Sequence, residues 1–236
     1  MKSLFLYIAI CLSFSAFAQK GDLKKLCTKL NDVFSSKNGL HLEYTMAMQG
    51  NAQHPETESM QMSMFKLNEQ DYKMVIGEEQ ILLHSGKTML QVNHSQKSIV
   101  IQTDSTSNVS SQALFADFRL LIDSASSVSD RKEKDELIYT LKFSSEFIYT
   151  SVTLKFSTKK ELLTSVYAEF SPDYPEPYHS LTVTYTLWDL KWKDSSGVLA
   201  LNQFVERKND IYVPVTAWNS YKVFQPAQGK INVKLK

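Results

Sequence analysis

The fold is decided by the stretch Leu40-His41-Leu42-Glu43-Tyr44-Thr45-Met46-Ala47-Met48-Gln49, in which apolar and polar residues alternate without a break. A period of two places alternate side chains on opposite faces of a β-strand, so this stretch predicts a strand with one apolar face. Similar runs follow at 60–67, 71–77, 80–85, 88–93 and 97–103. Because the breaks between them are short, we expect an antiparallel meander.

Two segments have the spacing of a helix instead. Apolar residues from Leu23 to Phe34 lie on one helical face, and residues 111–125 repeat the pattern. Strands are expected again at 137–143, 148–157, 163–170 and 179–192. A final extended region is expected at 211–224, where Pro214 limits pairing to an edge or bulge. The sequence therefore predicts a mainly β (α+β) fold: a single curved antiparallel sheet or incomplete β-barrel of about 11 strands, with two helices covering its concave face.

Residues 1–18 have the form of a secretory signal peptide. Lys2 precedes an apolar run, and Ala16-Phe17-Ala18 is a small-residue cleavage sequence, so we expect cleavage near Ala18 and one domain over residues 19–236. Lipidation of Cys11 is the alternative, but Ile10 stands where a small residue is expected. Cleavage would leave Cys27 as the sole cysteine, and export without disulfides fits the periplasm of a Gram-negative bacterium.

Composition and motifs exclude several classes of function. The formal net charge is +1, and loss of Lys2 would make the mature chain neutral, so nothing favours nucleic acid as a partner. No mature stretch approaches the ~20 apolar residues of a membrane span, and we expect a soluble monomer. Because nucleophile-elbow, zinc-protease, Cys-x-x-Cys and phosphate-loop motifs are missing, we expect no enzyme, cofactor or metal. A hydrolase using paired carboxylates such as Glu78-Glu79 stays an alternative.

The expected sheet has more apolar surface than two helices can cover. Its strands would present a face of roughly 1,000 Å², whereas two helices of this length cover about 400 Å². The sheet must therefore curl, bind something apolar or meet another protein. Methionines concentrate on the first strands, where they either fill the core or adapt to ligands of variable shape. The candidate ligand-binding residues are Leu42, Tyr44, Met46, Met48, Met60, Met62, Met64, Met74, Ile81, Leu83, Leu114, Phe118 and Leu121.

The order of these elements resembles the LolA superfamily of periplasmic lipoprotein carriers. The local match is residues 81–93, an apolar strand, a Gly86-Lys87-Thr88 turn and a second strand ending at Asn93, followed by a segment from Gln112 to Ile122 that is similar to the family's central helix. The resemblance implies an incomplete β-barrel whose concave face receives acyl chains of a lipoprotein or lipid, and it implies inner- and outer-membrane transport proteins as partners.

The sequence also departs from that family. Its members carry a basic turn before the third strand, with an arginine that latches the helices, whereas Leu67–Tyr72 contains no arginine. Arg119 is either a substitute or a solvated residue, and the chain after Trp192 does not match the family. The leading hypothesis is a periplasmic carrier, chaperone or binder of a hydrophobic ligand. The alternative is a cell-envelope interaction protein that docks a protein partner on the same sheet face.

Overall fold

The computed structural model describes residues 20–35, 38–53, 55–68, 70–103, 118–173 and 177–225. The expected signal peptide and the part of the second helix that contains Leu114 lie outside these residues. A helix covers 20–35, and α2 spans Phe118–Ser124. The first strands are β1 (Leu40–Gly50), β2 (Thr57–Lys66), β3 (Asp71–Ile76), β4 (Gln80–Ser85), β5 (Thr88–Asn93) and β6 (Ser98–Thr103). After α2 come β7 (Ser127–Glu133), β8 (Glu136–Lys142), β9 (Tyr149–Ser157), β10 (Leu163–Phe170) and β11 (Tyr178–Asp189).

The C-terminal elements are short. They are the 3₁₀ helix η2 (Leu201–Gln203), β12 (Val205–Lys208), β13 (Ile211–Pro214), the 3₁₀ helix η3 (Thr216–Trp218) and β14 (Lys222–Phe224). β12 and β13 form a separate antiparallel hairpin, so Pro214 lies opposite Val205 and not on the large sheet. The expected continuous extended region over 211–224 is therefore broken by η3.

The other strands form one open sheet in the order β14-β6-β5-β4-β3-β2-β1-β11-β10-β9-β8-β7. Consecutive pairs from β3 to β6 and from β7 to β11 are antiparallel, whereas β14 runs parallel to β6. The predicted class, a mainly β fold with an unclosed sheet and two helices, is confirmed, with 12 strands in the sheet.

Two strands are missing from the sequence prediction, β12 in the separate hairpin and β7 in the large sheet. The seven residues of β7 include Asp130, Arg131 and Lys132, and only Val128 is buried. β7 is the last strand of the sheet, and charged side chains on an edge strand discourage pairing with another chain. Such a strand shows no apolar alternation, because neither of its faces packs along its length.

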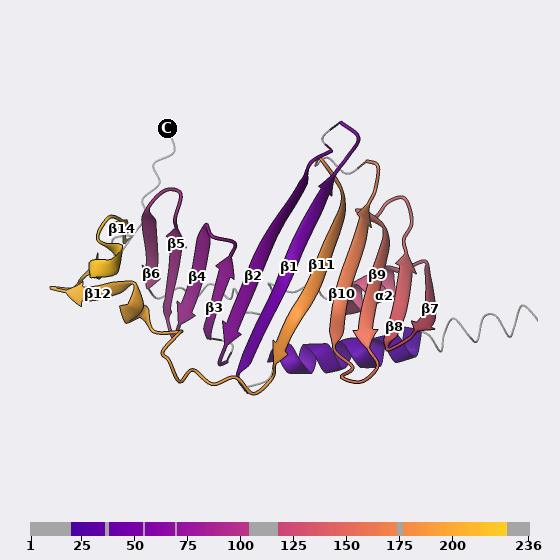
Figure 1. The fold of residues 1–236 in the computed structure, drawn as a ribbon, viewed down its shortest axis with the longest axis horizontal. Helices are drawn as coiled ribbons and strands as arrows, with labels where there is room; N and C mark the ends of the chain where they lie inside the picture. The colour runs from indigo at the N-terminus through magenta and orange to yellow at the C-terminus, as the bar shows by residue number, and fades with distance from the viewer. Residues whose placement is uncertain are drawn as a thin grey trace, which may run out of the picture. The chain divides into compact units, whose positions relative to one another are not determined.

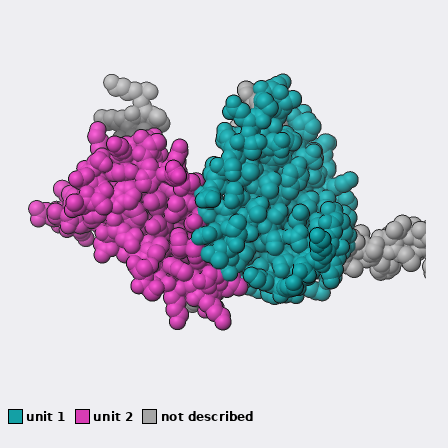
Figure 2. Space-filling model, in the orientation of Figure 1, with its two compact units in different colours: residues 1–36, 42–62, 113–188 teal, residues 37–41, 63–112, 189–236 magenta. Residues whose placement is uncertain are grey.

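The chain divides into two compact units, which Figure 2 colours separately. Unit 1 comprises residues 1–36, 42–62 and 113–188, and unit 2 comprises residues 37–41, 63–112 and 189–236. β1 and β2 each contribute residues to both units. In unit 1, the helix of residues 20–35 runs along one end of strands β8 to β11 (Figure 1).

Unit 2 has a core in which the C-terminal segment, residues 189–225, covers strands β4 to β6. Its buried residues are Leu83, Leu90, Val92, Ile99, Ile101, Leu199, Phe204 and Val205. Trp218, Tyr221 and Val223 pack around them, and β14 pairs with β6 at the end of the sheet. The two helices are thus not the only cover over the strands, since this segment, to which the sequence assigned no role, buries the apolar residues of unit 2.

Candidate functional site

The candidate site is the apolar face of unit 1 that packs against the helix of residues 20–35, which we call the helix-side face. Cross-strand partners share a face, and the register pairs Tyr139 with Leu154, Leu154 with Val166 and Val166 with Val183. On β1, Tyr44 belongs to the same face, because its ring lies 5.6 Å from that of Tyr185.

The helix buries one side against this face. Leu23, Cys27, Leu30 and Phe34 are each less than 5% exposed, at the spacing expected for one helical stripe. The Phe34 ring lies 5.7 Å from the ring of Trp188 at the end of β11. On α2, Phe118 and Ile122 are buried. Ion pairs join the helix to its surroundings, Lys24 to Asp123 on α2 at 2.7 Å and Lys29 to Glu161 in the β9–β10 turn. These pairs are exposed, so the apolar stripe supplies most of the attachment.

Titratable groups beneath the helix are held in their neutral forms. Burial raises the pKa of the Cys27 thiol to about 12, and burial raises the pKa of Tyr185, with Tyr44 adding to the shift. The pKa of Tyr139 is also raised, first by burial and then by Asp130. A thiol with a raised pKa is a poor nucleophile. The interior of unit 1 is therefore an apolar environment with no feature that activates Cys27.

Burial on the helix-side face of β1 decreases from Leu40 to Met48. Leu42 and Tyr44 are buried, whereas Met46 and Met48, which continue the same alternation, are partly exposed. On β2, Met62 is buried and Met60 is partly exposed. His41 of β1 stacks on Phe65 of β2, with ring centroids 4.2 Å apart, so these two residues share one face of the sheet. The methionines occupy the even-numbered positions of both strands and therefore share the opposite face. Met46, Met48 and Met60 thus form a partly exposed methionine strip on the helix-side face.

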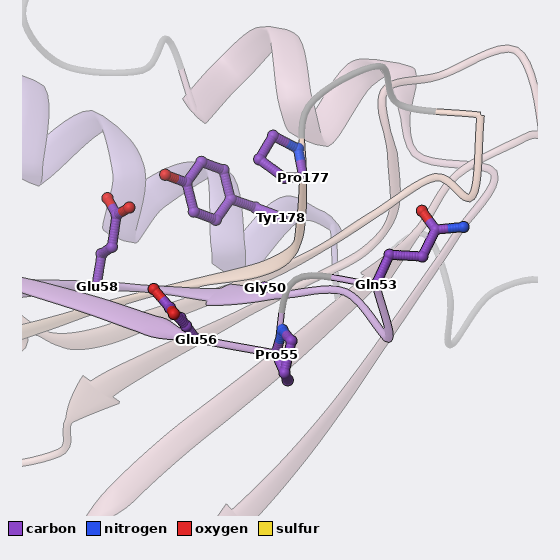
Figure 3. Close-up of a pocket in the computed structure, with 7 residues that line it drawn as sticks. All are labelled: Gly50, Gln53, Pro55, Glu56, Glu58, Pro177 and Tyr178. Carbon is purple, nitrogen blue, oxygen red and sulfur yellow. The ribbon is translucent and has the colours of Figure 1, made fainter.

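A pocket of about 330 Å³ lies beyond the strip, where β1, β2 and β11 meet their loops. Figure 3 shows the residues that line it, which are Gly50, Gln53, Pro55, Glu56, Glu58, Pro177 and Tyr178. Two backbone hydrogen bonds fix its walls, from Gly50 N to the carbonyl of Glu56 at 2.9 Å and from Asn51 N to the carbonyl of Pro177 at 2.8 Å. The pocket therefore places two carboxylates beside an apolar strip.

The structure brings together only part of the predicted ligand-binding set. Leu42, Tyr44, Met46, Met48, Met60, Met62, Phe118 and Leu121 belong to unit 1. Met64, Met74, Ile81 and Leu83 belong to unit 2. In unit 2 the register pairs Met74 with Leu82, so these two residues share one face of the sheet. Ile81 and Leu83 lie on the opposite face, together with Lys73. That face is the one covered by the C-terminal segment. A ligand-binding role for any of these residues stays a prediction.

An aromatic cluster in unit 1 escaped the sequence prediction. The rings of Phe143 and Phe147 stack with centroids 4.8 Å apart, and Tyr149 lies 5.5 Å from Phe170. Next to them, Ile148 is 53% exposed. The cluster assembles from the β8–β9 turn and the end of β10, so no local spacing in the sequence marks it. Glu56 and Glu58 were missed because the segment containing Pro55 has the composition of an ordinary turn.

Neither a metal-binding group nor a membrane-spanning helix is found among the residues that the structure describes. No group of three or more His, Cys, Asp or Glu side chains there could hold a metal ion. Among the same residues, no helix is both long and apolar enough to cross a membrane. The exposed Arg119 on α2 and the Glu78-Glu79 pair in the β3–β4 turn lie outside the pocket lining.

Comparison with solved structures finds folds similar to this one. They include a LolA superfamily protein from Nitrosomonas europaea, with 10% identity over 72% of this chain and 94% of that chain and a TM-score of 0.35. LprF from Mycobacterium bovis has 10% identity, coverage of 70% and 93% and a TM-score of 0.38. A DUF1329 family protein from Desulfovibrio piger has 9% identity, coverage of 80% and 98% and a TM-score of 0.36.

Comparison of sequences adds no relative. No protein-family model matches the chain, and no curated protein matches it. A LolA superfamily protein is among the solved structures to which this chain is similar.

Proposed function

We propose that this protein is an exported carrier or binder of a hydrophobic ligand, an acyl chain of a lipoprotein or lipid, and that it has no catalytic activity. The observation that carries the proposal is the methionine strip. Met46, Met48 and Met60 continue a buried apolar face yet stay partly exposed. Covering apolar surface is favourable, and a bound acyl chain would be stabilised by about 0.8 kcal/mol for each methylene that it buries. Methionine side chains adapt to chains of variable length and shape.

The helix of residues 20–35 gives the site a cover that can move. It meets the sheet through an apolar stripe, and its ion pairs to Asp123 and Glu161 are exposed and therefore weak. A ligand chain that slides from the strip toward Leu42 would replace contacts of the helix with contacts of its own. Such an exchange of like for like costs little and leaves the sheet in place.

The test is lipid binding by the purified protein. Protein isolated from a bacterial periplasm is expected to show lipid adducts in native mass spectrometry. The double variant Met46→Lys/Met48→Lys is expected to bind an acyl probe about tenfold less tightly, because two charges would have to be desolvated. Ala47→Lys is the matched control, since Ala47 lies between them on the opposite face of β1. The proposal would be contradicted if no adducts were found and the wild type, the double variant and Ala47→Lys bound the probe equally.

Export is part of the proposal and has its own test. Expression of the full chain in a Gram-negative host is expected to yield a periplasmic protein whose N-terminus is Gln19. A product that keeps Met1 and stays in the cytoplasm would contradict export, whereas a lipidated N-terminal Cys11 would support the alternative form of anchoring.

A further inference from the structure

We infer that the pocket beside the methionine strip binds the headgroup of an amphiphilic ligand, and that this headgroup is cationic. The inference rests on the proposed function, because it requires the acyl chain of the same ligand to lie on the strip. It adds what the strip alone does not specify, which is the chemistry of the polar end of the ligand.

The pocket and the strip are continuous along two strands. Glu58 and Met60 are alternate residues of β2, and Met48 and Gly50 are alternate residues of β1. Alternate residues on a strand point to one face and are about 7 Å apart. A ligand that follows these strands therefore passes from apolar to acidic surroundings within one or two side chains, which is the arrangement that matches an amphiphile.

The pocket is framed by backbone hydrogen bonds and not by its charged groups. Gly50 N and Asn51 N donate to the carbonyls of Glu56 and Pro177. Within the described residues, the carboxylates of Glu56 and Glu58 take part in no ion pair or side-chain hydrogen bond. In Figure 3 the Tyr178 ring extends from Pro177 toward the two glutamates. Both carboxylates are consequently available to a ligand without the loss of an existing contact.

These groups select the charge of the headgroup. Two carboxylates attract a cation and repel the carboxylate of a free fatty acid, and the aromatic face of Tyr178 adds an attraction for ammonium groups. Next to Tyr178 on β11, His179 donates from Nδ1 to the carbonyl oxygen of Gly50 at 3.1 Å.

The experiment compares three ligands with one chain length, decyltrimethylammonium, decanoate and decanol, by calorimetry at about pH 8 and below their micellar concentrations. The wild-type protein is expected to bind the ammonium compound about tenfold more tightly than decanoate, and the difference should shrink as salt is added. Glu56→Gln/Glu58→Gln is expected to lose this preference while its affinity for decanol is unchanged.

The matched control is Glu78→Gln/Glu79→Gln, which removes the same charge from the β3–β4 turn and should keep the preference. Decanol binding without a preference for either charged headgroup, or a preference that survives in Glu56→Gln/Glu58→Gln, would overturn the inference and leave the proposed function standing. If none of the three ligands binds, the proposed function fails and the inference fails with it. Thermal melts of both double variants check that each is folded.

Discussion

The rings of Phe34 and Trp188 lie with their centroids 5.7 Å apart, and this contact fastens the helix of residues 20–35 to the end of β11. Trp188 is itself held in two ways. Its indole Nε1 donates to the carbonyl of Leu163 at 2.9 Å, and its ring lies 5.2 Å from that of Tyr185. The helix thus packs on an aromatic side chain whose orientation is fixed by the neighbouring strand.

Removal of the Phe34 ring should loosen the helix. Phe34→Ala is expected to lower the free energy of unfolding by about 3 kcal/mol, because a buried aromatic side chain is lost from a packed core. Trp188→Phe keeps a ring but removes the hydrogen bond to Leu163, at a cost of about 1 kcal/mol. Urea denaturation measures both values, and binding of a hydrophobic dye reports the uncovered face. Equal and small losses in the two variants would show that the contact does not attach the helix.

Two glycines should respond to alanine in opposite directions. A Cβ on Gly39 would lie 1.8 Å from the carbonyl oxygen of Trp192, and a backbone atom cannot yield as a flexible side chain does. Gly39→Ala is therefore expected to destabilise the protein by several kcal/mol or to prevent folding. A Cβ on Gly21, within the first helix, would meet nothing within 4 Å. Gly21→Ala should stabilise by about 0.5–1 kcal/mol through helix propensity. Thermal denaturation of the two variants decides both points.

Cys27 should make stability sensitive to alkaline pH. Its pKa is raised from 9.0 to about 12 in the folded protein. The folded state keeps the thiol protonated. The contribution of Cys27 to the free energy of unfolding is therefore fully present below about pH 9. It is lost as pH rises toward 12, because the unfolded chain ionises first, with a slope of at most about 1.4 kcal/mol per pH unit.

Unfolding free energies measured from about pH 8 to 11 check this expectation. Cys27→Ala should show a shallower decline than the wild type over that range, although it loses some packing at every pH. An unchanged slope in Cys27→Ala would contradict the assignment. Alkylation provides a separate readout, since the native thiol should react far more slowly than the thiol of the urea-unfolded chain.

Asp194 should hold the C-terminal segment of unit 2 in place. Its carboxylate accepts hydrogen bonds from Val198 N at 2.6 Å and Leu199 N at 3.0 Å. Burial lowers the pKa of Lys73, and the negative charge of Asp194 partly reverses this shift. Lys73 Nζ lies 5.2 Å from the centroid of the Phe204 ring. Asp194→Ala is expected to cost about 1–3 kcal/mol, because two backbone donors lose their acceptor, and to lower the Lys73 pKa further.

Hydrogen exchange measures the local effect of that change. Amides of residues 197–205 should exchange faster in Asp194→Ala than in the wild type. Asp210→Ala serves as the control, since Asp210 pairs with Arg207 in an exposed turn and should contribute little. Equal protection in the two variants would mean that Asp194 does not anchor the segment.

Sequence periodicity identified most of the strands because one face of each strand is buried. β3, β4, β5 and β10 lie within a residue of their expected bounds. The prediction failed at β7, where charged residues dominate, and at β12, where only Val205 is buried. Both exceptions follow from the same rule, since a strand without a buried face leaves no alternation to read.

The candidate site was less predictable than the fold. Ile81, Leu82 and Leu83 are consecutive apolar residues, so alternation could not reveal which of them faces the C-terminal segment. The pocket needs Pro177 and Tyr178 beside Glu56 and Glu58, and the aromatic cluster needs Phe170 beside Tyr149. These neighbours meet only when strands far apart in the sequence pair.

By itself the sequence determined the mainly β class, the helix over residues 20–35 and the apolar character of alternate positions, because these depend on local periodicity. Only the tertiary structure decided which apolar residues are covered by the protein's own segments and which stay partly open. That outcome depends on contacts between residues far apart in the chain, such as Phe34 with Trp188 and Leu83 with Phe204 in their respective cores. Local spacing sets which face of a strand is apolar, whereas packing sets what lies against it.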